Sequence, residues 1–81
     1  MKVSLTKGAI KELKKIDKRY QKLITQKIKL LEKFPDTTNV KRLTNHFPPY
    51  RFRVGDYRVK FDVVDDEVII YEIKHRKEAY K

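Results

Sequence analysis

The spacing of apolar residues changes once along the chain, at Tyr50. Before that point, apolar residues recur every three or four positions, which is the period of one face of an α-helix. After it, apolar and charged residues alternate, which is the period of a β-strand with one buried face. The pattern therefore predicts a helical first half followed by a sheet.

Two helices are expected in the first half, after a short strand at Lys2–Leu5. Thr6 is a suitable N-cap for the first helix, and Asp17 is expected to interrupt the chain between the two helices. Phe34-Pro35 ends the second helix, because a residue before proline is pushed out of helical geometry. The apolar sets of the two helices are Ala9, Ile10, Leu13 and Ile16, and Tyr20, Leu23, Ile24, Ile28 and Leu31.

The second half predicts an antiparallel meander, after a loop over residues 35–49 in which 41–43 could pair briefly with a strand. Gly55-Asp56 separates two alternating runs, and a Gly-X pair suits a two-residue type II′ hairpin turn. A turn at 64–67 leads to a third strand at Val68–Lys74. Its inward residues are expected to be Ile69, Tyr71 and Ile73, although a one-residue change of loop length would swap the faces.

The predicted order is β-α-α-β-β-β, an α+β fold in which a helical hairpin packs on one face of an antiparallel sheet. Residues 1–81 are expected to form a single domain with one modest core. The chain has no cysteine, which excludes disulfides and thiolate metal sites. Its two histidines, His46 and His75, lie far apart, so we expect no metal and no cofactor. No apolar run approaches the ~20 residues of a membrane span, and we expect a cytoplasmic protein without a membrane partner.

The charge is strongly positive and unevenly placed. The formal net charge is +10, and residues 1–49 hold 13 Lys and Arg against 4 Asp and Glu. Such a surplus favours a polyanion, because each neutralised phosphate releases condensed counterions. An acidic partner protein, or a solvated lysine-rich helical surface, would be equally compatible with the charge alone.

One face of the predicted hairpin gathers four cations. If Gly55-Asp56 forms a two-residue turn, Arg53 lies opposite Arg58, and Arg51 lies opposite Lys60. Like charges in directly opposed positions destabilise a sheet, so folding gains nothing from this pattern. The side chains could simply spread into water, but two such pairs behind an apolar face favour an anion-binding site.

The terminal segment continues directly from the last strand and adds His75, Arg76 and Tyr80. Imidazole titrates near neutrality, guanidinium binds phosphate through two hydrogen bonds, and a tyrosine ring can stack on an unpaired base. Alone, the segment would be an ordinary basic tail. Beside a cationic sheet face, it supplies the groups needed to cleave RNA without a metal.

The chain resembles the RelE/ParE superfamily over essentially its whole length. The residues that carry the resemblance are Tyr50-Arg51-Phe52-Arg53-Val54-Gly55-Asp56-Tyr57-Arg58-Val59, then His75-Arg76-Lys77-Glu78-Ala79-Tyr80, with Ala9–Leu13 and Lys41-Arg42-Leu43. The resemblance implies a type II toxin, silenced by a co-encoded antitoxin. RelE-like members cleave mRNA in the ribosomal A site, whereas ParE-like members inhibit DNA gyrase. The basic residues favour the RelE-like branch.

The resemblance also implies roles for individual residues. Arg58 matches a phosphate-binding arginine, Arg76 a basic residue of the terminal segment, and Tyr80 a terminal tyrosine that would hold the target base. Cleavage would proceed by attack of a ribose 2′-hydroxyl on the adjacent phosphate. Some relatives carry lysine at the positions of Arg51 and Arg53, but arginine stays protonated and cannot act as a base. His75 is therefore the expected site of any proton transfer.

Further basic residues are expected to bind RNA. Lys60 departs from the aliphatic residue common in relatives, and it could contact phosphate or pair with Glu72. The helical lysines would dock on ribosomal RNA through its backbone. The expected RNA-binding set is Lys60, Lys74, Lys77, Lys14, Lys18 and Lys22. A ParE-like gyrase inhibitor and a non-catalytic ribosome- or RNA-binding module remain the alternatives.

Overall fold

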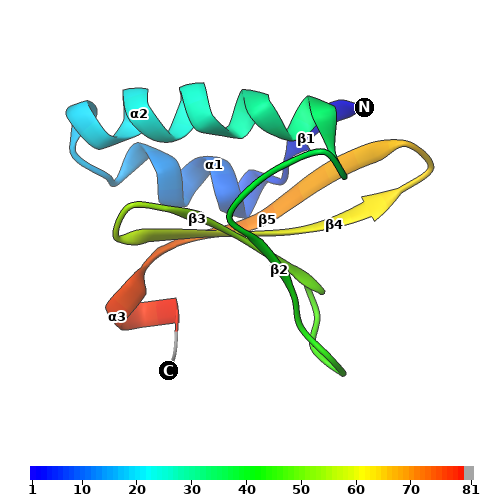
Figure 1. Cartoon of the computed structure of the whole chain (residues 1–81). Helices are drawn as coiled ribbons and strands as arrows, with labels where there is room; N and C mark the ends of the chain where they lie inside the picture. Colours follow the sequence, from blue (N-terminus) through cyan, green and yellow to red (C-terminus); the bar gives the residue numbers. More distant parts are fainter. Residues whose placement is uncertain (80–81) are drawn as a thin grey trace.

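A five-stranded sheet carries two helices on one face in the computed structural model, which describes residues 1–79 (Figure 1). The elements are β1 (Lys2–Leu5), α1 (Lys7–Lys14), α2 (Lys18–Ile28), the 3₁₀ helix η1 (Lys29–Lys33), β2 (Val40–Arg42), β3 (Tyr50–Val54), β4 (Tyr57–Val64), β5 (Glu67–His75) and α3 (Arg76–Ala79). The strand order is β1-β5-β4-β3-β2. The α+β class is confirmed.

The sheet is mixed, and in this detail the expected antiparallel sheet is corrected. β1 pairs in parallel with β5, and the other neighbouring strands pair antiparallel. The chain leaves β1 at one edge of the sheet and crosses through the helical layer to β2 at the opposite edge. It then returns strand by strand to β5, which lies beside β1 and runs parallel to it. The segment expected to pair only briefly forms β2, which extends the sheet beside β3.

The predicted helical hairpin is confirmed: Thr6 caps α1 as expected, and Asp17, expected only to interrupt the chain, caps α2. The Thr6 hydroxyl accepts a hydrogen bond of 3.1 Å from the backbone N–H of Ala9. The Asp17 carboxylate accepts one of 2.9 Å from the N–H of Arg19 and begins α2. That backbone hydrogen bond holds the pKa of Asp17 below its ordinary value. Phe34 has an extended backbone (φ −53°, ψ 135°), which ends η1 before the proline.

The turn between β3 and β4 has the predicted form and fixes the register of the hairpin. Gly55 has φ of +57°, and Asp56 is not in the positive-φ region, which is the sign pattern of a type II′ turn. Val54 therefore pairs with Tyr57. The next hairpin turns at Asp65 and Asp66, both with positive φ (47° and 60°), the conformation of a type I′ turn.

The inward face of β5 differs from the prediction. The register shifts between Lys60 and Phe61, so that Lys60 pairs with Glu72 but Phe61 pairs with Ile70. Tyr71 is the extra residue of this bulge, and the alternation of faces changes phase there. Ile69 and Tyr71 were therefore wrongly placed inward, and Ile73 was correct. The buried residues of β5 are Val68, Ile70 and Ile73.

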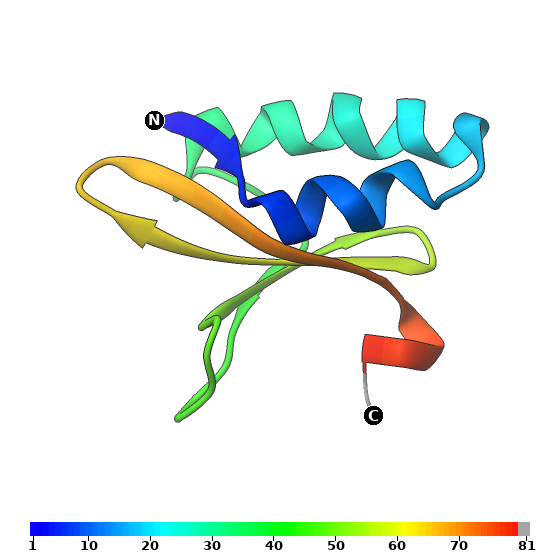
Figure 2. The same cartoon turned by 180° about the vertical axis from the view of Figure 1, so that it is seen from behind.

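The core lies between the sheet and the two helices, and Figure 2 shows this layering from behind. The helical layer contributes Ala9, Ile24, Ile28 and Leu31, and the sheet contributes Phe52, Val54, Val59, Phe61, Val68, Ile70 and Ile73. Three residues expected to face the core are exposed instead, namely Ile10, Tyr20 and Leu23. Their positions leave apolar surface on the helical side of the molecule.

Candidate nucleic-acid interface

Four cations lie on the face of the sheet away from α1 and α2. We call this group the cationic face: Arg51, Arg53, Arg58 and Lys60. The predicted pairs are confirmed, because Arg53 pairs with Arg58 and Arg51 pairs with Lys60 across the hairpin. Since β3 and β4 sit in the middle of the sheet, their neighbours extend both rows. Lys41 of β2 pairs with Arg51, and Lys74 of β5 pairs with Arg58.

Two of the four cations are held against the sheet instead of spreading into water. Arg58 and Lys60 are each only 9% exposed. The Arg58 Nη1 group donates hydrogen bonds to the carbonyl oxygens of Gly55 (2.9 Å) and Tyr57 (3.1 Å). Lys60 Nζ lies 3.3 Å from a carboxylate oxygen of Glu72, the pairing that the sequence left open. These contacts fix the direction of both charges, which is the preorganisation that an anion site requires.

A hollow of about 380 Å³ opens between the arginines and β2. Arg51, Arg53 and Arg58 line one side, and Asn39, Val40 and Lys41 line the other. The volume falls in the range of about 300–1,000 Å³ typical of ligand pockets. A phosphate placed in this hollow would meet cationic side chains from three strands.

The helix α3 lies on the same side of the sheet as this hollow, opposite α1 and α2 (Figures 1 and 2). Its first residue is attached to the β3–β4 turn: the Arg76 N–H donates a 2.6 Å hydrogen bond to the Asp56 carbonyl. The Arg76 guanidinium is largely exposed, and its Nη1 lies 4.0 Å from the Asp56 carboxylate. The structure thus brings Arg76 to the edge of the cationic face, as expected.

His75 lies on the other face of the sheet. It pairs with Tyr57, and cross-strand partners point to the same side. The two rings meet edge to face, with centroids 5.4 Å apart, and Tyr57 also packs on Tyr20 of α2. Burial raises the pKa of Tyr57. The expected grouping of His75 with the arginines is therefore not observed, and Tyr80 lies outside the described residues.

The remaining predicted RNA-binding lysines occupy separate places. Lys74 contacts Glu12 of α1 in an ion pair, and this hydrogen bond raises the pKa of Lys74. Lys77 is exposed on α3. Lys14, Lys18 and Lys22 are exposed on the helical layer, so they form a different surface from the cationic face.

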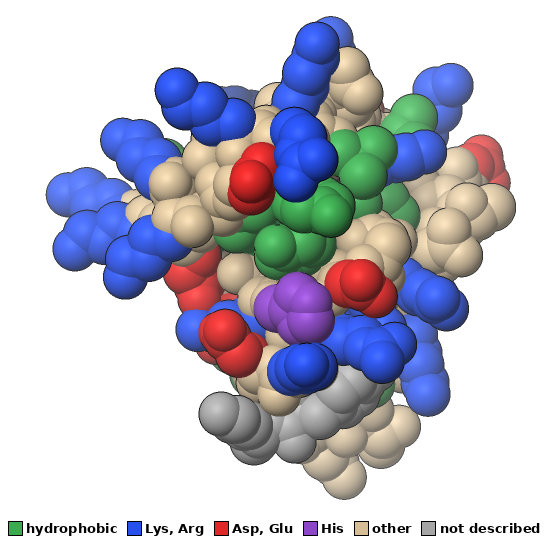
Figure 3. Space-filling model, turned by 90° about the vertical axis from the view of Figure 1, so that its left-hand side faces the viewer, with side chains coloured by type: hydrophobic (Ala, Val, Ile, Leu, Met, Phe, Trp, Pro, Cys, Tyr) green, Lys and Arg blue, Asp and Glu red, His purple; other side chains and the backbone are tan. Residues whose placement is uncertain are grey.

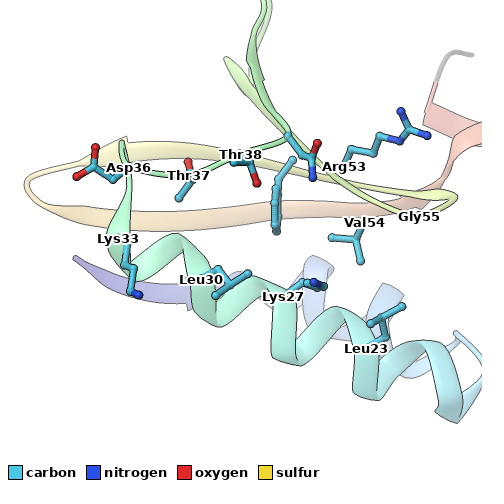
Figure 4. Close-up of a pocket in the computed structure, with 12 residues that line it drawn as sticks. Leu23, Lys27, Leu30, Lys33, Asp36, Thr37, Thr38, Arg53, Val54 and Gly55 are labelled. Carbon is cyan, nitrogen blue, oxygen red and sulfur yellow. The ribbon is translucent and has the colours of Figure 1, made fainter.

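The sequence analysis missed two features of the site. Lys41 completes the row of Arg51, and alternation along β2 would have placed it there. A groove of about 400 Å³ between α2, η1 and β3 was also missed (Figure 4). Leu23 and Leu30, 40% and 47% exposed, stand along its helical side with Lys27 and Lys33. The signal was that Leu23 and Leu30 recur at helical spacing with each other, on a different side of the helix from Ile24 and Ile28, which face the core.

Comparison with known proteins identifies the family. The family model for the ParE toxin of the type II toxin–antitoxin system parDE matches residues 3–80. The chain belongs to the RelE/ParE superfamily of type II toxins. A curated superfamily member, toxin RelE3 of Methanocaldococcus jannaschii, is 31% identical, and the match covers 99% of this chain and 96% of the relative.

Solved structures of superfamily members share the fold. The toxin in the RelB–RelE antitoxin–toxin complex from Methanococcus jannaschii has a TM-score of 0.78 and 26% identity, over 94% of this chain and 93% of that one. The archaeal RelE–RelB complex from Pyrococcus horikoshii OT3 gives a TM-score of 0.75 and 27% identity, over 93% of each chain. The family model bears the ParE name and these relatives the RelE name, so membership does not by itself choose the target.

Two further observations concern the described residues 1–79. They contain no group of three or more His, Asp or Glu side chains placed to hold a metal ion. No helix among them has the length and apolar character needed to cross a membrane.

Proposed function

We propose that this superfamily member is an endoribonuclease that cleaves mRNA in the ribosomal A site. The observation that carries the proposal is the cationic face, where two pairs of opposed cations lie beside a hollow that a phosphate could occupy. The RelE-named relatives support the same branch.

The proposed reaction is attack of a ribose 2′-hydroxyl on the adjacent phosphorus. The bond between the 2′-oxygen and phosphorus forms as the bond from phosphorus to the 5′-oxygen breaks. The 2′-hydroxyl proton passes to water and the departing 5′-oxygen takes a proton from water, which yields a 2′,3′-cyclic phosphate and a 5′-hydroxyl fragment. Addition of water to the cyclic phosphate would give the 3′-phosphate. Arg58 and Arg76 would stabilise the charge of the pentacoordinate phosphorane, with Arg51 and Arg53 beside them. Preorganised charge of this kind is usually the largest contribution to such catalysis.

Proton transfer has a smaller place in this proposal than the sequence suggested. Arg51, Arg53 and Arg58 remain protonated and cannot act as bases. Because His75 is on the opposite face, in-line placement of the 2′-hydroxyl and charge stabilisation would carry most of the rate. Tyr80 is proposed to hold the target base, as in the family resemblance.

Docking on the ribosome is assigned to a second surface. Lys14, Lys18 and Lys22 are exposed on the helical layer and would contact ribosomal RNA through its phosphates. Reversing these three charges to Glu should weaken ribosome binding by at least about tenfold and lower its salt dependence. The fold should be unchanged, because none of the three side chains lies in the core.

An acidic antitoxin is the proposed protein partner. Because translated mRNA is the proposed substrate, the proposed site of action is the cytoplasm. Structure neighbours of the chain were solved as RelB–RelE complexes. Arg53 and Asn39 line both the hollow and the groove of Figure 4. One antitoxin segment could therefore place apolar side chains against Leu23 and Leu30 and carboxylates on the cationic face.

The deciding experiment is addition of the purified toxin to a translating extract, followed by primer-extension mapping of a reporter mRNA. Cuts confined to translated frames, and absent with Arg58→Ala, are expected. Intact mRNA with retained ribosome affinity would instead indicate a non-catalytic ribosome-binding module.

DNA gyrase is the second candidate target, because the matching family model carries the ParE name. Inhibition of supercoiling by the purified protein, with reporter mRNA left intact, would establish that function in place of cleavage.

A further inference from the structure

We infer that His75 is a positioning residue, which caps α3 and thereby fixes Arg76 beside the cationic face. The functional half of this inference rests on the proposed cleavage of RNA. The capping half concerns the folded chain alone and can be tested without any substrate.

The cap is visible in the hydrogen bonding of α3. His75 is the last residue of β5 and immediately precedes the helix. Its Nδ1 accepts a hydrogen bond of 3.3 Å from the backbone N–H of Lys77, the second residue of α3. An N-cap side chain normally bonds the N–H groups at this position or the next. Because α3 has only four residues, and so short a helix is marginal by itself, one cap is a large part of what holds it.

The imidazole is itself held in place from the helical side of the sheet. Its ring packs edge to face on Tyr57, and Tyr57 packs on Tyr20 of α2 at a centroid distance of 5.7 Å. Figure 3 views the end of the molecule at the left of Figure 1, where a histidine lies below a hydrophobic patch and beside Lys and Arg side chains. The capping nitrogen is therefore fixed by contacts with the α2 layer, although α3 lies on the other side of the sheet.

The β3–β4 turn connects this cap to the proposed catalytic charges. The carbonyl of Asp56 holds the N–H of Arg76. The neighbouring carbonyls of Gly55 and Tyr57 hold the guanidinium of Arg58. Because backbone carbonyls of one turn bind both arginines, the docked α3 sets the position of Arg76 relative to Arg58. Loss of the cap would let α3 unwind beyond the Arg76–Asp56 backbone hydrogen bond, so the Arg76 side chain would lose its fixed position while Arg58 keeps its own.

Asparagine and alanine separate this role from proton transfer. An Asn side chain is among the best N-caps, because its amide oxygen accepts the same backbone hydrogen bond, but it cannot exchange protons near neutral pH. Alanine supplies neither group. The informative variants are thus His75→Asn and His75→Ala, with His46→Ala as the matched control in the loop between β2 and β3, where its Nδ1 lies 3.1 Å from the Pro48 carbonyl oxygen.

The experiment measures each variant in two ways. Hydrogen exchange of the Lys77 amide by NMR reports the cap, and single-turnover cleavage of ribosome-bound mRNA reports the site. For His75→Ala we expect about fivefold faster exchange at Lys77 and at least about fivefold slower cleavage, from the usual contribution of one N-cap. His75→Asn should return both to within about twofold of the parent protein, with apparent ribosome affinity unchanged throughout.

Two outcomes would overturn the inference. If His75→Asn restores protection at Lys77 but cleaves as slowly as His75→Ala, the imidazole takes part in the chemistry. If His75→Ala exchanges and cleaves like the parent, His75 does not cap α3. Failure of the proposed function has a different signature: the parent protein would cut no mRNA, and the exchange of Lys77 would still decide the cap.

Discussion

The two faces of the β3–β4 hairpin share one backbone but follow opposite rules. On the helical side, Phe52, Val54, Val59 and Phe61 are at most 5% exposed and fill the core. On the other side stands the cationic face, with like charges directly opposed. Such pairs cost stability, so burial explains the first face and cannot explain the second. The contrast separates residues that fold the protein from residues that give it a function.

The largest effect is expected from the apolar face. Phe61 is fully buried and packs on Phe34 and Tyr50, with ring centroids 5.6 and 5.2 Å away. Phe61→Ala should lower the free energy of unfolding by about 3–5 kcal/mol, measured by urea denaturation. Val64→Ala, at an exposed position of the same strand, should cost far less. Equal losses from the two variants would contradict the assignment of the core.

The cationic face should respond more in activity than in stability. Arg58→Ala should slow mRNA cleavage by about a hundredfold to a thousandfold, because it removes a preorganised charge. Losing its two hydrogen bonds to the turn should lower the unfolding free energy by about 1–3 kcal/mol, and relief of the Arg53–Arg58 repulsion should offset part of that loss. Arg58→Lys should also be slow, because lysine keeps the charge but lacks the planar fork. Full activity in either variant would contradict the role of Arg58.

A stabilising substitution would sharpen the contrast further. Arg53→Gln removes one member of the Arg53–Arg58 pair and should raise the free energy of unfolding by up to about 0.5 kcal/mol, while cleavage falls. The gain should shrink in high salt. Arg19→Gln is the matched control, because Arg19 pairs with Asp17 and its loss relieves no repulsion. A gain in both variants would indicate a general charge effect.

The smallest effect concerns Lys74, which belongs to the cationic row by register but is paired with Glu12. Glu12→Gln should lower the pKa of Lys74, because the Glu12 carboxylate now raises it. A raised pKa in the folded state stabilises the protein below the unfolded pKa of about 10.4. This contribution disappears as the pH rises through the folded pKa. The parent protein should therefore lose more stability than Glu12→Gln in strongly alkaline buffer, as followed by NMR titration and thermal melting.

Gln retains an oxygen for the N–H of Ile73, which Glu12 accepts at 3.2 Å. The hydrogen bond that joins α1 to β5 should therefore be kept in the variant. If the Lys74 titration does not move, another group holds its ammonium.

The hairpin could be predicted in detail from the sequence because local chemistry determines it. Gly55 accepts the positive φ that the turn needs, and the turn length then fixes every pair between β3 and β4. The opposed arginines followed from that register alone. The caps at Thr6 and Asp17 were predictable for the same reason, since a cap depends on residues a few positions away.

Contacts distant in sequence could not be predicted in this way. The parallel pairing of β1 with β5 joins the two ends of the chain, and no local pattern encodes it. The bulge at Tyr71 depends on how β5 fits between two neighbours, and it reversed the faces of Ile69 and Tyr71. The position of His75 was accessible, because alternation from the inward Ile73 already puts it on the helical side, away from the arginines.

The β3–β4 turn also has a genetic consequence. Its three carbonyl groups belong to the backbone, so no side-chain change at these positions can delete them. Gly55 is nonetheless the sensitive position of the turn, because any other residue is strained at its φ of +57° by about 1 kcal/mol. A single-base change in the Gly55 codon would displace the supports of Arg58 and Arg76 together and leave the apolar face intact. Among cells that survive such a toxin by mutation, this codon is where we would look for a folded but harmless protein.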